Sequence, residues 1–165
     1  MIQEKEGDLL KAFEDGEVNC LCHCANVSNV MGAGIAKLIS KRWPQALEAD
    51  IKSGKGPNKI GTFSIAKVDE FRVIVNIYGQ LGIGCPKNDP LQRNARYDAV
   101  FDSLYKLKIR IDNSDFPAVI GFPYGMAANL AGGKWSIVRE IIYTIFDDSD
   151  ISVIIYKLPG ALELD

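Results

Sequence analysis

The most constraining feature of this sequence is the regular alternation of short apolar runs with amphipathic stretches. Val18–Ala25 and Phe116–Phe122 are largely apolar, which is typical of strands buried on both faces. The stretches between such runs carry apolar residues at helical spacing, as at Tyr97, Val100, Leu104, Leu107 and Ile111, and again at Trp135, Val138, Ile142 and Ile145. Strands that alternate with helices predict a mostly parallel sheet covered on both sides, and therefore the α/β class.

The same patterns predict where the elements lie. Strands are expected at Ile2–Glu6, Val18–Ala25, Ile60–Ala66, Arg72–Tyr78, Phe116–Phe122 and Ile151–Tyr156. Helices are expected to end near Phe13, to span Ala33–Arg42, to run from Pro44 to about Lys52, and to follow the two apolar stripes. Gly79–Asn94 is predicted to be a long irregular connection, of the kind that carries function or covers a site.

Composition excludes several classes of protein. The length of 165 residues predicts one domain, and a net charge of −2 has the wrong sign for a protein that holds a nucleic-acid polymer. Met1–Gly7 has no apolar signal core, so a cytoplasmic location is predicted. The longest uncharged stretch, Phe116–Gly133, contains Pro117 and Pro123 and is therefore not expected to cross a membrane.

Four cysteines are too few for a disulfide scaffold of this length. Cys20, Cys22 and Cys24 alternate along a predicted strand, so their thiols face one side and His23 faces the other. Only Cys85 and His23 could complete a metal site with them, so no metal and no cofactor are predicted. Reduced cysteines buried in the core are the expected state.

Ligands of parallel sheets bind beyond the carboxyl ends of the strands. Three segments qualify: Asn26–Ala36, Tyr78–Cys85 and Pro123–Trp135. The first has glycines where a helix starts, and free N–H groups at a helix start attract phosphate. The third is a second glycine-bearing loop between a strand and a helix, so the pair favours a diphosphate. The alternatives are a tight turn without a ligand and a loop that only covers the sheet edge.

An ordered set of motifs resembles the macrodomain family, within it the branch of ADP-ribose-1″-phosphate phosphatases and mono-ADP-ribose hydrolases. The matching segments, which span nearly the whole chain, are Gly7-Asp-Leu-Leu10, His23-Cys-Ala-Asn26, Met31-Gly-Ala-Gly-Ile-Ala36, Trp43-Pro44 with Glu48-Ala-Asp50, Ile60-Gly-Thr-Phe-Ser64, Val75-Asn-Ile-Tyr-Gly-Gln80 and Leu130-Ala-Gly-Gly-Lys-Trp135. The resemblance implies a single macrodomain over residues 1–165, a three-layer α/β/α fold with a mixed, mostly parallel sheet of about six strands.

The resemblance also implies a binding site for ADP-ribose. Asp8, with the Leu9 backbone beside it, would accept the adenine amino group; a helix N-cap is the alternative role of Asp8. Asn26 would bind the distal ribose, or form a turn. The full set of implied ligand-binding residues is Asp8, Leu9, Asn26, Met31, Gly32, Ala33, Gly34, Ile35, Ala36, Pro123, Gly125, Met126, Ala127, Ala128, Asn129, Leu130 and Tyr156.

Two departures from the family pattern bear on catalysis. Ala127-Ala-Asn129 stands where the family has glycines, so positive-φ backbone is disfavoured and a reshaped loop is expected. Lys134 replaces the acidic residue proposed as the family's catalytic base. His23, Asn26 and Lys134 are the candidate catalytic residues, with a buried core histidine as the alternative for His23.

The resemblance implies an enzyme that hydrolyses the 1″-phosphate of ADP-ribose-1″-phosphate or removes ADP-ribose from a modified protein. The alternative is a non-catalytic reader of ADP-ribose, which Lys134 and the altered loop favour. A third hypothesis is a different nucleotide-using α/β enzyme. The expected partners are ADP-ribose or its derivatives, and neither a nucleic-acid polymer nor a membrane.

Overall fold

The computed structural model describes residues 1–83 and 93–164. Its elements are β1 (Ile2–Glu6), α1 (Leu9–Glu14), β2 (Cys20–Asn26), α2 (Gly34–Arg42), α3 (Gln45–Lys52), the 3₁₀ turn η1 (Pro57–Lys59), β3 (Phe63–Lys67), β4 (Val73–Gln80), α4 (Tyr97–Asp112), β5 (Val119–Pro123), the 3₁₀ turn η3 (Asn129–Ala131), α5 (Trp135–Phe146) and β6 (Ser152–Lys157). The prediction that strands and helices alternate is confirmed.

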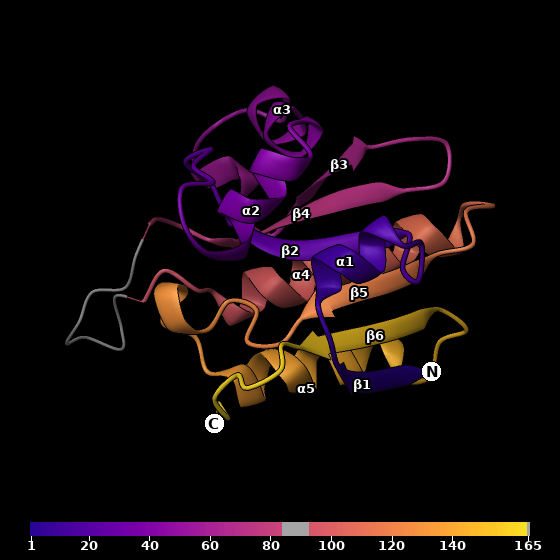
Figure 1. The fold of residues 1–165 in the computed structure, drawn as a ribbon. Coiled ribbons are helices and arrows are strands. Elements are labelled where there is room, and N and C mark those ends of the chain that lie inside the picture. Colours follow the sequence, from indigo (N-terminus) through magenta and orange to yellow (C-terminus); the bar gives the residue numbers. More distant parts are fainter. Residues whose placement is uncertain (84–92, 165) are drawn as a thin grey trace.

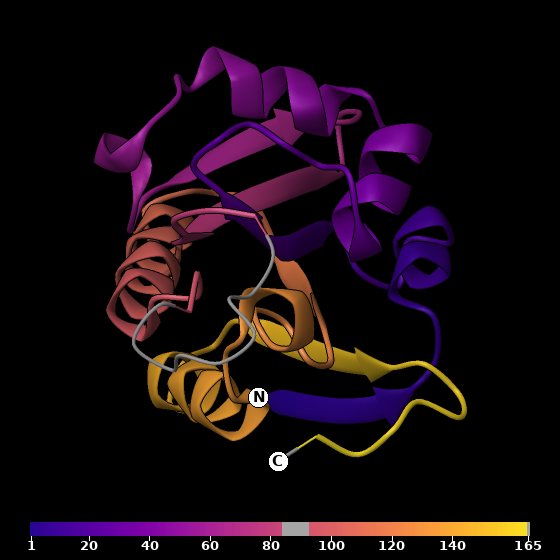
Figure 2. The same cartoon turned by 90° about the vertical axis from the view of Figure 1, so that its left-hand side faces the viewer.

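The strands form one six-stranded sheet in the order β1-β6-β5-β2-β4-β3. Neighbouring strands run parallel, except that β3 runs antiparallel to β4 at the edge. The predicted mixed, mostly parallel sheet is thus confirmed. Helices α1, α2 and α3 cover one face of the sheet, and α4 and α5 cover the other (Figures 1 and 2).

Side chains on the two faces of β2 pack into two separate hydrophobic clusters. Cys20 and Cys22 pack in the cluster under α4 and α5, whereas Leu21 packs under α1 and α2. Cys20, Cys22 and Cys24 are free thiols, and Cys85 lies outside the described residues. None of the helices in the described ranges is long and apolar enough to cross a membrane.

The largest differences from the predicted strand starts are at β3 and β5, which both begin three residues later than predicted. The strand expected from Ile60 starts at Phe63, because η1 and the positive φ of 74° at Gly61 turn the chain first. The strand expected from Phe116 starts at Val119, since Pro117 has no N–H to donate to a neighbouring strand. The later start of β5 leaves its carboxyl end at Pro123, whereas the antiparallel β3 has its amino end beside the carboxyl end of β4.

Candidate functional site

The five parallel strands of the sheet end on one side of it, and four of them lead to the two predicted loops and their neighbours. The strands β4, β2, β5 and β6 lie in this spatial order, and their last residues are Gln80, Asn26, Pro123 and Lys157. The chain that leaves β2 leads into α2, and the chain that leaves β5 leads through η3 into α5. The two predicted glycine-bearing loops therefore meet at this edge.

A cavity of about 580 Å³ lies between these two loops. Its described lining consists of Cys24, Ala25, Asn26, Val30, Gly32, Ala33, Gly34, Ile35, Ala36, Gln80, Ile83, Gly125, Ala128, Asn129, Leu130 and Ala131. The loops approach each other at Gly34, where an added Cβ would lie 3.5 Å from Cδ1 of Leu130, an ordinary van der Waals distance. Gly34 has a φ of 56°, so glycine suits this position for its backbone freedom.

No charged side chain belongs to the described lining of this cavity. Its polarity comes partly from the start of α2, where the N-cap residue Ala33 has no side-chain acceptor to offer. The N–H groups of Gly34, Ile35 and Ala36 therefore have no partner within the helix. Together with the helix dipole they suit an anion such as a phosphate.

In the loop after β5, two residues that are not glycine have a left-handed backbone. Ala127 has a φ of 60° and Asn129 has a φ of 51°. The expectation that Ala127 excludes such a conformation is wrong. The carbonyl of Ala127 accepts a hydrogen bond from Gly133 N at 3.0 Å, and a Cβ on Gly133 would lie 2.3 Å from that oxygen. Gly133 thus permits the close approach that holds Ala127 in place.

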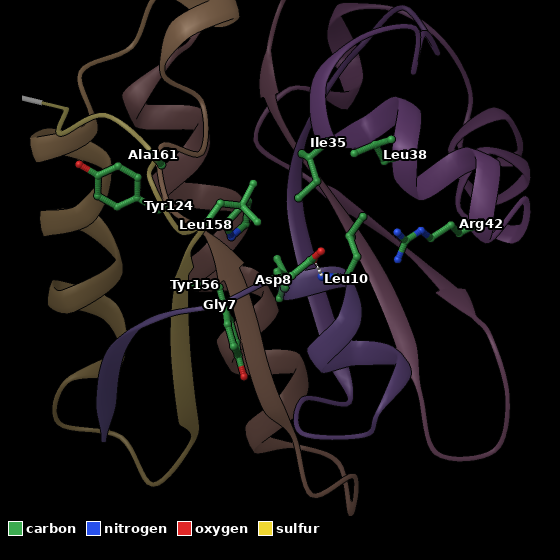
Figure 3. Close-up of a pocket in the computed structure, with 12 residues that line it drawn as sticks. Gly7, Asp8, Leu10, Ile35, Leu38, Arg42, Tyr124, Tyr156, Leu158 and Ala161 are labelled. Carbon is green, nitrogen blue, oxygen red and sulfur yellow. Dashed lines mark hydrogen bonds between the residues drawn. The ribbon is translucent and has the colours of Figure 1, made fainter.

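A smaller, mostly apolar pocket of about 170 Å³ adjoins the cavity (Figure 3). Its lining comprises Gly7, Asp8, Leu9, Leu10, Ile35, Leu38, Arg42, Pro123, Tyr124, Tyr156, Leu158 and Ala161. Ile35 lines both spaces, so together they extend along the sheet edge from β6 to β4. An elongated ligand with an apolar end and an anionic middle fits this arrangement.

Asp8 caps α1 and also lines the small pocket. Its Oδ1 accepts hydrogen bonds from Leu10 N at 2.8 Å and Lys11 N at 3.3 Å. The N-cap role offered by the sequence is therefore present. Because both bonds use Oδ1, the second carboxylate oxygen is left for a ligand in the pocket (Figure 3).

Asn26 likewise has a structural role at the cavity wall. Its Oδ1 accepts from Ser28 N at 3.0 Å, and its Nδ2 donates to the carbonyl of Val30 at 2.8 Å. These bonds are those of a turn-forming asparagine, the alternative role considered for it. Since Asn26 also lines the cavity, its amide can still meet a ligand.

The catalytic candidates His23 and Lys134 do not line either space. His23 is fully buried in β2, so the geometry matches the buried core histidine and gives no support to acid–base work. Lys134 is exposed at the N-cap of α5, where its backbone N–H donates to the Tyr97 hydroxyl at 2.9 Å and its carbonyl accepts from Val138 N at 3.3 Å. Their catalytic roles stay predictions, since the positions of these two side chains do not support them.

Most of the other predicted binding residues line one of the two spaces, and a few do not. Leu9, Pro123 and Tyr156 line the small pocket, and the predicted residues of the two loops line the cavity, except Met31, Met126 and Ala127, which are buried. Cys24, Gln80 and Arg42 also line these spaces although they were not among the predicted binding residues. Gln80 lies in Tyr78–Cys85, one of the three segments predicted to lie at the carboxyl ends of strands, although it was not named as a binding residue.

Burial raises the pKa of the Cys24 thiol to about 12. The thiol is therefore protonated near neutral pH and is a poor nucleophile. Within residues 1–83 and 93–164, no group of three His, Cys, Asp or Glu side chains could hold a metal ion.

No protein-family model matches the chain. An uncharacterized 17.5 kDa protein of Enterobacteria phage T4 is 26% identical over 155 residues, which cover 90% of this chain and 92% of the phage protein. Polyprotein P1234 of Barmah forest virus is 25% identical, over 96% of this chain but only 6% of the polyprotein. The chain thus spans a small part of that viral relative.

Solved structures give a clearer result. A Bacteroides thetaiotaomicron protein of unknown function matches with a TM-score of 0.79 and 28% identity, over 94% of this chain and 97% of the other. The macrodomain of Thermus aquaticus DarG matches with a TM-score of 0.74 and 24% identity, over 95% and 98%. The chain has the macrodomain fold. Thermosipho africanus DarTG, in complex with ADP-ribose, shares this macrodomain fold with a TM-score of 0.75 and 16% identity, over 99% of this chain and 43% of that one.

Proposed function

We propose that this macrodomain binds ADP-ribose along the edge where β6, β5, β2 and β4 end. Adenine occupies the small apolar pocket, with its amino group on Asp8. The diphosphate meets the first turn of α2 and the loop after β5, and the distal ribose lies toward Asn26 and Gln80. The observation that carries the proposal is that both glycine-bearing loops line one cavity next to a pocket that contains a carboxylate.

Two similar structures support this ligand. Thermosipho africanus DarTG and an Oceanobacillus iheyensis macrodomain mutant, which matches with a TM-score of 0.59, both contain ADP-ribose. The apolar pocket, the uncharged cavity and the unpaired N–H groups of α2 match the adenine and diphosphate of that nucleotide in chemistry and order.

Recognition is better supported than turnover. Among the described residues that line the cavity, the only ionisable side chain is the Cys24 thiol. Hydrolysis of ADP-ribose-1″-phosphate or of a protein-linked ADP-ribose stays a prediction, and it would depend on a water positioned at the distal ribose.

The test is a calorimetric titration with ADP-ribose, with ATP as the control nucleotide, followed by incubation with ADP-ribose-1″-phosphate and a measurement of free phosphate. We expect binding of ADP-ribose in preference to ATP. Phosphate release would add phosphatase activity to this function, and no release would identify a reader or a hydrolase of protein-linked ADP-ribose. Equal or absent binding of both nucleotides would contradict the proposal.

A further inference from the structure

Lys59 is a buried lysine at the end of η1, only 6% exposed. Its ammonium lies 2.7 Å from Oδ1 of Asp50, which is 1% exposed, and also donates to the carbonyl of Gly54 at 2.9 Å. The Tyr78 ring lies beneath it, with its centroid 4.0 Å away. A buried ammonium is stable only when its charge and its protons are matched in this way.

A further donor bond of Lys59 reaches the loop at the cavity. Its ammonium donates to Oδ1 of Asn29 at 2.7 Å. Asn29 has a left-handed backbone, with a φ of 58°. The same segment is also tied down by Gly56 N, which donates to the carbonyl of Val27 at 2.9 Å. The loop between Asn26 and Val30 is thus held in place by Lys59 and Gly56, which do not line the cavity.

This loop supplies the wall of the cavity at the end of β2. Asn26 and Val30 both line the cavity, and they bond to each other through the Asn26 amide. Asn29 lies between them in sequence and is absent from the described lining. A change in the contact between Lys59 and Asn29 would therefore reach the ligand only through the position of Asn26 and Val30.

We propose that Lys59 is a positioning residue for the distal-ribose end of the cavity, and that it acts through Asn29 on Asn26 and Val30. The inference rests on the proposed function, because the distal ribose is the part of ADP-ribose placed at this wall. ADP has the same adenosine and diphosphate but lacks the distal ribose. It therefore serves as a ligand that Lys59 should not affect.

The test compares Asn29→Gly with Asn29→Asp, because Gly and Asp both tolerate positive φ but only Asp keeps an acceptor for Lys59. Calorimetry would give the Kd values of each variant for ADP-ribose and for ADP. We expect Asn29→Gly to bind ADP-ribose about tenfold more weakly and ADP as wild type does, a shift typical of a lost contact within a coupled network. Asn29→Asp should bind both ligands within about twofold of wild type.

Lys59→Met adds a second line of evidence. If it folds, it should also bind ADP-ribose more weakly, and adding Asn29→Gly to it should cost no further affinity, because the contact between Lys59 and Asn29 is already broken. Unchanged ADP-ribose affinity in Asn29→Gly, or an equal loss for ADP and ADP-ribose, would overturn the inference alone. Wild-type protein that binds neither nucleotide would overturn the proposed function and this inference together.

Discussion

Nε2 of His23 lies 2.6 Å from Oδ1 of Asn76, on the strand next to it. Asn76 donates from Nδ2 to the carbonyl of Ala46 and to Oγ of Ser64, so its oxygen is the atom that faces the imidazole. Nε2 must therefore carry the ring proton. Nδ1 is unprotonated and has no hydrogen-bond partner among the described residues. The neutral ring joins β2 to β4 beneath α3.

Replacing His23 with Gln should change the pH dependence of stability and leave binding unchanged. Burial lowers the pKa of His23 below its ordinary 6.5. As the pH falls below 6.5, His23 becomes protonated in the unfolded chain while it stays neutral in the folded chain. The free energy of unfolding of the wild type therefore decreases, by at most about 1.4 kcal/mol per pH unit. His23→Gln should lose this component, as measured by urea unfolding at pH 7.5, 6.5 and 5.5. If the free energy of unfolding changed equally with pH in both proteins, His23 would not be the buried group with the lowered pKa. Weaker ADP-ribose binding in His23→Gln would show that His23 contributes to the ligand site.

Two variants of Asp8 should separate its role as the N-cap of α1 from its proposed role in binding adenine. Asp8→Asn keeps a capping oxygen, whereas Asp8→Ala removes it and should cost about 1 kcal/mol of unfolding free energy. Both remove the carboxylate that would accept the adenine amino group, so both should lose the preference for ADP-ribose over the inosine analogue, which has an oxygen in place of that amino group. Calorimetric Kd values for the two nucleotides check this. A preference retained in Asp8→Asn would contradict the adenine assignment.

Ala127 should tolerate glycine better than Ala128 does. Both methyl groups are buried, but Ala127 has a left-handed backbone whereas Ala128 is extended, with a φ of −90°. Ala127→Gly relieves about 1 kcal/mol of backbone strain, which offsets the lost methyl group and the greater freedom of the unfolded chain. Thermal unfolding should therefore show Ala128→Gly to be the less stable variant. The reverse order would mean that Ala127 is unstrained.

Lys134→Asp should stabilise the protein. The N-cap of α5 makes no side-chain hydrogen bond at present. An aspartate there can accept from the first turn and interact favourably with the helix dipole, a gain of about 1 kcal/mol. Thermal melts should show a higher Tm than wild type, and Lys134→Ala, which has no capping atom, serves as the matched control. Lys134→Asp should not gain phosphate release, because residue 134 does not line the cavity. Such a gain would show that the residue reaches the substrate.

The sequence predicts the order and type of the elements well because the apolar periodicity is strong. The stripe from Trp135 to Ile145 corresponds to α5, and the run ending at Phe122 corresponds to β5. Start positions are less predictable, since a local turn at Gly61 or a missing donor at Pro117 overrides the apolar pattern.

The loops at the carboxyl ends of the strands were also predictable, but the roles of single side chains were not. The identity of a side chain does not show that His23 faces Asn76 in the core. Nor does it show that the carbonyl of Ala127 accepts a hydrogen bond from Gly133 N. Arg42 was expected only as the end of a helix, and its place in the small pocket depends on the position of α2 relative to α1, where Arg42 pairs with Glu14 at 3.5 Å. The predicted long irregular connection Gly79–Asn94 falls largely on residues 84–92, which lie outside the described part of the chain.

Ile35 is the residue that lines both the small pocket and the cavity. Two unrelated fragments that occupy the two spaces would therefore lie next to the same isoleucine. A short linker that passes this side chain would make the binding of the second fragment intramolecular, so the linked compound should bind far more tightly than either part. Inhibitors of this protein could thus be assembled from adenine-like and anionic pieces found separately, without starting from a nucleotide.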